Sequence, residues 1–184
     1  THTRASTATY TDSAGNLVWN AHNLLTYSED FSNAAWTLND GATRATSSEI
    51  DPIGGTGAFL LSVVASNSYI SQQKAFPSTT NGTIAVWVKK PSAGAATHIR
   101  ITTNNTAGWG TGLSTKFELS ASWQLIELSG DLIASGATCK IIYGGITDAA
   151  AGDADCQGDV LIWGAHLYRS DLGGMADVPL DERG

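Results

Sequence analysis

Short segments in which every second residue is apolar recur along this chain, with turn residues between them. Ile84, Val86 and Val88 form one such set, and residues 97–103 repeat the same alternation. Side chains of a β-strand point alternately to its two faces, so each segment has one core face and one mixed face. Sheets built from such strands stack core face to core face. The pattern therefore predicts an all-β fold, a two-sheet antiparallel β-sandwich.

Further strand signals and their turns fill in the rest of the chain. Residues 4–10 and 17–19 flank a turn cluster and predict an N-terminal β-hairpin. One short helical turn is expected at 28–36, where Ser28 precedes acidic residues in the first turn. Regularly spaced short strands are typical of a sandwich or barrel, and the remaining ones are expected at 42–46, 58–65, 69–76, 83–89, 115–119, 123–128, 138–146 and 159–168.

The length of 184 residues indicates one main domain. We expect an N-terminal hairpin or arm at residues 1–22, a sandwich at 23–170 and a tail or linker at 171–184. No signal-peptide pattern is visible at the start of the chain. The first residue is Thr1 instead of Met, as expected for a chain that is processed or cut from something longer.

Charge argues against two classes of partner. The chain has 10 Lys and Arg against 17 Asp and Glu, for a formal net charge of −7. The basic residues are scattered, and neutralising phosphates requires them to cluster, so nucleic-acid binding is disfavoured. The same balance disfavours an anionic membrane surface, and no apolar stretch approaches the roughly 20 residues of a spanning helix.

Three tryptophans are expected in the core: Trp36, Trp123 and Trp163. In residues 159–168, Leu161, Trp163, Ala165 and Leu167 are expected on one face, yet the opposite face is apolar too. This predicts a central strand covered on both sides, by the N-terminal hairpin or by a neighbouring subunit.

Three segments, in the order in which they occur, resemble a known family. Residues 23–36 (NLLTYSEDFSNAAW) resemble the opening of a jelly-roll domain that recurs in tailed-bacteriophage virion proteins. Residues 163–167 (WGAHL) resemble its final strand, with His166 where Gln is usual. Residues 4–15 resemble a segment that often precedes the domain.

The resemblance implies a jelly-roll-like, carbohydrate-binding-module-like sandwich on the surface of a phage particle, in a tail fibre, head fibre, spike or capsid decoration protein. It implies adhesion to host cell-surface polysaccharide without catalysis, contacts with other virion proteins, and a homo-oligomer, expected to be a trimer. The alternatives are a purely architectural virion part, a domain of a depolymerase spike, and a secreted bacterial carbohydrate-binding module.

Trp109 is the leading candidate for a sugar contact. It lies in a polar, Gly-rich loop, where its ring has no obvious core partner. The ring could stack on a sugar while Asn104 and Asn105 bond hydroxyl groups. The alternatives are that Trp109 caps an edge of the sandwich or contacts another subunit.

A second candidate patch combines Trp87 and Lys89 with His98 and Arg100. These residues are expected on the non-core faces of two neighbouring strands, where they could bind an acidic polysaccharide. The alternative, which we favour, is a solvated sheet face with Trp87 covered by another element.

The acidic loop of residues 148–159 is a candidate for a structural calcium site. Asp148, Asp153 and Asp155 supply the carboxylate oxygens that calcium prefers. The spacing of an EF-hand is absent, and a hydrated acidic loop is the plainer interpretation. No other cofactor is expected.

Catalytic motifs are missing from the sequence. No pair of histidines four residues apart, no Gly-x-Ser-x-Gly elbow and no phosphate-binding glycine loop occurs. A glycosidase needs two carboxylates about 5–9.5 Å apart, and nothing in the sequence pairs them. We therefore expect a protein that is not an enzyme.

The two cysteines, Cys139 and Cys156, are expected to remain thiols. If strands 138–146 and 159–168 form a hairpin, the two residues lie about 20 Å apart, too far for a disulfide. Thiols also fit a protein made in a reducing cytosol.

Overall fold

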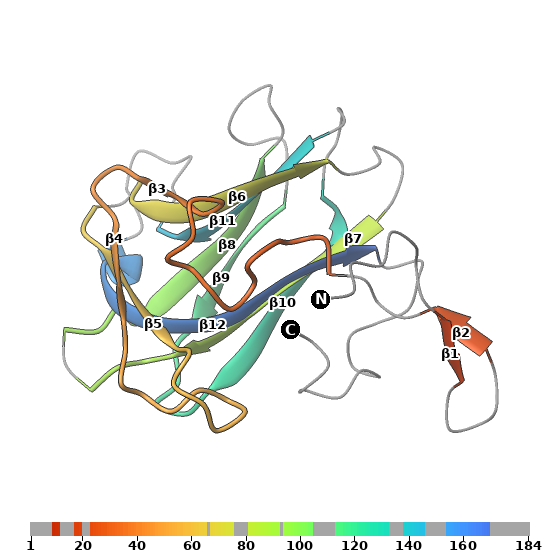
Figure 1. Cartoon of the computed structure of the whole chain (residues 1–184). Coiled ribbons are helices and arrows are strands. Elements are labelled where there is room, and N and C mark those ends of the chain that lie inside the picture. Colours follow the sequence, from red (N-terminus) through yellow and green to blue (C-terminus); the bar gives the residue numbers. More distant parts are fainter. Residues whose placement is uncertain are drawn as a thin grey trace.

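A computed structural model describes residues 9–11, 17–19, 23–65, 67–75, 81–92, 94–104, 113–132, 138–145 and 154–169. This part is almost entirely β-structure (Figure 1). Its elements are β1 (Thr9–Thr11), β2 (Leu17–Trp19), β3 (Thr37–Asn39), β4 (Thr43–Thr46), β5 (Phe59–Val63), β6 (Tyr69–Ala75), β7 (Asn81–Lys89), β8 (His98–Asn104), β9 (Ser114–Glu118), β10 (Gln124–Asp131), β11 (Thr138–Gly144), the short 3-10 turn η1 (Ala154–Cys156) and β12 (Gly158–Arg169).

Two five-stranded sheets make up the body. Sheet I has the order β10-β7-β12-β5-β4, and sheet II has the order β3-β6-β11-β8-β9. All strand pairings within them are antiparallel. The sheets face each other across the core (Figure 1). The predicted antiparallel, jelly-roll-like sandwich is thus confirmed, as is the hairpin, because β1 pairs with β2.

The core forms where the apolar sides of the two sheets meet. Ile84, Val86 and Val88 of β7 face Ile99 and Ile101 of β8 across it, and all five are buried. This is the alternation seen in the sequence, with one side chain in two pointing inward. Burying such side chains stabilises the fold by about 1.5–3 kcal/mol each, so the core fixes which face of each strand points outward.

A β-bulge interrupts β12 and changes which of its residues face the core. The register against β7 shifts between Trp163 and His166, around Gly164 at φ +58°. Val160 and Ile162 before the bulge, and Ala165 and Leu167 after it, belong to the core cluster. The predicted grouping of Trp163 with Ala165 on one face was therefore wrong, because a bulge inserts one unpaired residue and inverts the alternation.

β12 is nevertheless buried on both sides, as expected. Leu161, Trp163, His166 and Tyr168 point away from the core and are no more than 6% exposed. Trp163 lies under the segment 47–57, since its Nε1 would be only 3.2 Å from a Cβ placed on Gly57. At Trp163 the cover is therefore this segment, not the predicted hairpin or neighbouring subunit.

Residues 47–57 connect β4 to β5 and cross the outer face of sheet I, and we call them the strap. Asp51 organises the strap from inside and is 6% exposed. Its Oδ1 accepts hydrogen bonds from the amides of Ile53 (3.1 Å) and Gly55 (2.7 Å), and its Oδ2 accepts one from Gly57 (2.9 Å). A carboxylate that satisfies three backbone N–H groups holds an irregular segment in one shape.

The segment 23–36 closes one open side of the sandwich without forming a helix. Three successive turns replace the predicted helical turn, with amides of Asp30, Asn33 and Trp36 each bonded to the carbonyl three residues earlier. The start of the segment lies beside β12, where the amide of Leu24 donates to the carbonyl of Leu167 (2.8 Å). Its apolar residues Leu25, Phe31 and Trp36 enter the core.

Two other expectations depended on which strands are neighbours. The predicted hairpin of strands 138–146 and 159–168 was wrong, because β11 lies in sheet II and β12 in sheet I. The distance argument against a disulfide therefore loses its premise, and the thiol state of Cys139 and Cys156 stays a prediction. Cys156 is buried, and the side chain of Cys139 is outside the described residues. The division at residues 22/23 and 170/171 also stays a prediction.

Within the described part of the chain, no helix has the length and apolar character needed to cross a membrane.

Candidate functional site

Polar side chains line the outer face of sheet II, which we call the polar face. Strand register places the members of one row opposite each other on all five strands, at Asn39, Tyr69, Gly144, Arg100 and Lys116. A second, parallel row contains Thr37, Ser71, Ile142, Thr102 and Ser114. Both rows alternate with core residues of the same strands, so those of their side chains that the structure describes face away from sheet I.

Hydrogen bonds between neighbouring strands order the polar face. Arg100 donates from its guanidinium to Oγ of Ser114 (3.1 Å), and the hydroxyls of Thr102 and Ser114 lie 2.9 Å apart. At the other edge, the amide of Asn39 donates to Oγ of Ser71 (3.3 Å). Such cross-strand contacts hold side chains in defined positions before any ligand arrives.

A charged cluster sits at the β8–β9 end of the polar face. Asp155 of η1 accepts a hydrogen bond from Nζ of Lys116 (2.5 Å), and its Oδ2 lies 3.4 Å from Nδ1 of His98. The amide of Thr97 donates to the carbonyl of Asp155 (3.0 Å), which ties η1 to the start of β8. The hydrogen bond from Lys116, together with the charges of Lys116 and His98, lowers the pKa of Asp155 below its ordinary range.

This geometry predicts a pH-dependent contribution of Asp155 to stability. Asp155→Asn should lower the free energy of unfolding by about 0.5 kcal/mol near neutral pH, because the pair is partly exposed and solvent screens it. The folded-state pKa lies below the unfolded one, so this stability is present above about pH 4 and is lost as the pH falls through the folded pKa. Urea unfolding at about pH 7 and about pH 2 measures both regimes.

Glu127→Gln, at an exposed position on β10 of sheet I, is the matched control for loss of a carboxylate. A difference between Asp155→Asn and the parent that persists unchanged at the lower pH would contradict the ion pair as its cause.

The predicted site residues do not all come together. His98 and Arg100 lie on the polar face, and register places Asn104 there too, opposite Lys140, although its side chain is not described. Trp109 and Asn105 are outside the described residues, so the sugar platform there stays a prediction.

The calcium prediction is also only partly visible. Asp148 and Asp153 are outside the described residues, and the carboxylate of Asp155 is engaged by Lys116 and His98. Among the residues that are described, no group of three or more His, Cys, Asp or Glu could hold a metal ion.

Trp87 does not belong with His98 and Arg100, and the predicted four-residue patch was wrong. Trp87 and Lys89 lie on β7 in sheet I, whereas the other two residues lie on β8 in sheet II. The strands are similar in sequence pattern, and nothing in a period of two tells which sheet a strand joins. Trp87 is partly exposed, and its Nε1 is buried with no hydrogen-bond partner among the described residues.

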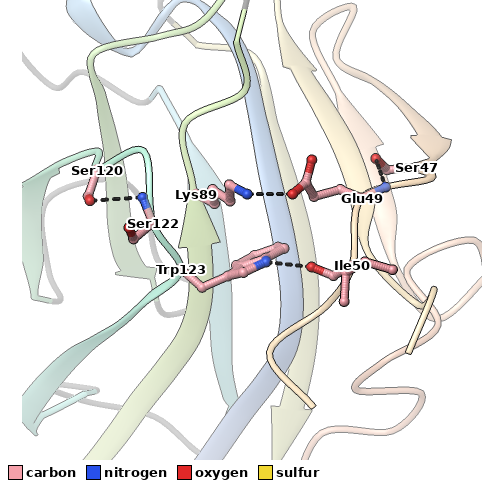
Figure 2. A network of polar contacts seen from close by, with 7 residues as sticks. All are labelled: Ser47, Glu49, Ile50, Lys89, Ser120, Ser122 and Trp123. Carbon is pink, nitrogen blue, oxygen red and sulfur yellow. Dashed lines mark hydrogen bonds and ion pairs between the residues drawn. The ribbon is translucent and has the colours of Figure 1, made fainter. Parts of the chain in front are cut away.

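Trp123 does not lie in the core, contrary to the prediction. It was expected in the core, but it is partly exposed on the outer face of sheet I. Its Nε1 donates to the carbonyl of Ile50 in the strap (2.7 Å), and Lys89 beside it forms an ion pair with Glu49 (Figure 2). A tryptophan next to a turn predicts apolar packing, but the indole N–H of Trp123 anchors the strap.

Several residues of the polar face were not singled out from the sequence, notably Asn39, Tyr69, Ser114 and Lys116. The alternation of polar with apolar residues in 114–118 was the signal that could have found the last two. Asn39 lies on a three-residue strand, β3, which was not predicted.

No protein-family model matches the sequence, and no curated protein matches it. Solved structures do resemble the fold. The CBM22-1 xylan-binding domain of Paenibacillus barcinonensis Xyn10C is 12% identical at a TM-score of 0.59, over 81% of this chain and 95% of that domain. TmCBM61, solved with β-1,4-galactotriose, is 14% identical at a TM-score of 0.53, over 80% of this chain and 99% of that one.

A phage protein is also similar. The enzymatically active domain of bacteriophage CBA120 tailspike protein 4 is 15% identical at a TM-score of 0.53, over 80% of this chain. The match spans only 21% of the tailspike structure. At these identities the likeness shows the fold alone, which is the jelly-roll β-sandwich of carbohydrate-binding modules.

Proposed function

We propose that this chain is a non-catalytic carbohydrate-binding module of a bacteriophage particle, and that it binds host cell-surface polysaccharide on the polar face. The row from Asn39 to Lys116 carries the proposal. A sugar chain offers hydroxyl groups along its length, and this row offers accessible donors and acceptors on three strands, at Asn39, Arg100 and Lys116, whereas Tyr69 is only 4% exposed. Neighbouring strands are about 4.8 Å apart, so the row is about 19 Å long and suits several rings of a chain.

The charge of the polar face favours an acidic sugar. Arg100 and Lys116 are direct cross-strand neighbours there, in a protein whose net charge is −7. A guanidinium can bind a carboxylate with two parallel hydrogen bonds, which an ammonium cannot do. Asp155 offsets part of this positive charge at the Lys116 side, so Arg100 is the residue that we assign to a sugar carboxylate.

Two lines of support favour a phage particle. The sequence segments at 23–36 and 163–167 resemble a virion jelly-roll domain, and one similar structure belongs to a phage tailspike. Two other similar structures are a xylan-binding domain and a complex with β-1,4-galactotriose, which favours binding over catalysis. On a virion, a trimer and contacts with other virion proteins would bring several weak sites together, and linked weak sites bind far more tightly than one.

Binding of the purified chain to a glycan array and to alginate, an acidic polysaccharide, tests the proposal. Arg100→Ala should weaken binding of an acidic glycan about tenfold, because it removes a charge-assisted hydrogen bond. Lys90→Ala, which removes one positive charge near the end of β7 in sheet I, is the matched control and should bind as the parent does. Rising salt should weaken the interaction further.

Two outcomes would contradict the proposal. If the parent protein binds no glycan, the architectural role remains as the alternative. If Arg100→Ala and Lys90→Ala weaken binding equally, net charge and not the polar face is responsible.

A further inference from the structure

A second group of partly exposed residues lies on the opposite side of the sandwich. Trp87 of β7 pairs with Leu125 of β10, and Lys89 and Trp123 are the next outward residues of the same two segments. Their outward direction follows from the core positions of Val88 and Ile126, which alternate with them. We call Trp87, Lys89, Trp123 and Leu125 the aromatic face.

The strap reaches the aromatic face but does not bury it. Trp163, the neighbour of Trp87 across the sheet, is 2% exposed beneath the strap. Trp87, Trp123 and Leu125 remain partly exposed. Ile50, which meets Trp123 at the strap, is 55% exposed. The strap therefore buries Trp163 of β12 but leaves Trp87 of the neighbouring strand β7 partly exposed.

Contacts hold the aromatic face in a fixed geometry. The indole N–H of Trp123 is already used by the carbonyl of Ile50, so the ring cannot turn without losing that bond (Figure 2). The ion pair of Lys89 with Glu49 fixes the strap one residue away (Figure 2). A rigid ring loses little conformational entropy when a ligand stacks on it.

We propose that the aromatic face is a second sugar-binding surface, which stacks a pyranose ring of a polysaccharide on Trp123. This rests on the proposed function and adds a site opposite the polar face. Stacking suits the C–H side of a sugar, while the partly exposed Lys89 and Glu49 can donate to and accept from its hydroxyls. A protein partner would instead have to desolvate the ion pair in the middle of its interface, which is costly.

Trp87 adds an independent observation. Its Nε1 is buried without a partner among the described residues, and a donor left in this state is destabilising. Gly164 lies beside this ring, since a Cβ placed on it would be 3.5 Å from Cδ1 of Trp87. Because this N–H is buried, a sugar hydroxyl or a bridging water would satisfy it only if the indole ring of Trp87 turned toward the ligand.

Native electrophoresis in gels that contain xylan, β-1,4-galactan or alginate tests the inference on the whole chain. Trp123→Ala should raise the dissociation constant for a retarding polysaccharide about tenfold, since it removes the stacking surface. Trp123→Phe keeps a flat ring but loses the bond to Ile50 and should retain most of the affinity. Circular dichroism checks that both variants fold.

The outcomes separate this inference from the proposed function. Retardation lost in Trp123→Ala, kept in Trp123→Phe and independent of Arg100→Ala supports a second site. Retardation lost only in Arg100→Ala overturns the second site and leaves the polar face standing. Equal loss in both Trp123 variants shows that the strap anchor matters instead of stacking, and it overturns the inference. No retardation of the parent protein overturns both proposals.

Discussion

Trp36→Ala should lower the free energy of unfolding by about 3–5 kcal/mol, a large part of the 5–15 kcal/mol typical of a domain. Trp36 is 2% exposed, and its ring centroid lies 4.7 Å from that of Phe31 and 6.1 Å from that of Tyr143. Truncation would remove these contacts and leave a cavity between segment 23–36 and sheet II. It would also remove one of the two donors to the carbonyl of Tyr27, the indole N–H (2.9 Å), and leave the amide of Asp30 (3.2 Å).

Trp36→Phe separates packing from the hydrogen bond. Phenylalanine keeps most of the apolar contact but leaves the carbonyl of Tyr27 without the indole N–H, so its loss should be about 1–2 kcal/mol. The midpoint and slope of urea unfolding measure both variants. Were the alanine variant as stable as the phenylalanine variant, segment 23–36 would not be the closure of the core that its contacts indicate.

The strands could be predicted well because their signal is local. Nine predicted strands of the sandwich, from residues 42–46 to 159–168, have counterparts in the structure with ends that differ by a few residues. Alternation, turn residues and β-branched side chains all act within a few positions of the chain. The outward direction of Arg100 also followed, because it stands between Ile99 and Ile101.

The assignment of strands to sheets could not be predicted in the same way. Trp87 and Arg100 both stand on outward faces, but only the long-range pairing of β7 with β12 and of β8 with β11 puts them on opposite sides. Trp123 was misplaced for a related reason. Its position depends on the strap, and the strap is held by Asp51 and backbone amides, which carry no periodic pattern.

The sequence also does not show which glycines the fold requires. Gly164 allows the bulge that inverts the faces of β12. Gly158, at the start of the same strand, has a different role, because backbone passes directly over its Cα. Both have positive φ, but only their surroundings in the folded chain distinguish them.

Gly158→Ala should therefore destabilise the protein by more than about 3 kcal/mol, well beyond the effect of its conformation alone. A Cβ there would lie 2.6 Å from the amide nitrogen of Ala96 and 2.7 Å from the carbonyl oxygen of Gly94, both rigid backbone atoms. Relieving this overlap requires breaking two backbone hydrogen bonds of Asp159. Its amide donates to the carbonyl of Gly94 (2.9 Å), and its carbonyl accepts from the amide of Ala96 (3.1 Å). Since these residues lead into β8, the start of the polar face should shift as well.

Gly164→Ala is the matched control for this prediction. Its φ of +58° also disfavours alanine, by about 1–2 kcal/mol, but the nearest atom to a new Cβ is a side-chain carbon at 3.5 Å. Urea midpoints should therefore fall in the order parent, Gly164→Ala, Gly158→Ala. Equal midpoints for the two variants would mean that residues 94–96 can move away from β12 at little cost in free energy. The anchoring of His98 and Asp155 through that junction would then be much looser than the hydrogen bonds between these segments indicate.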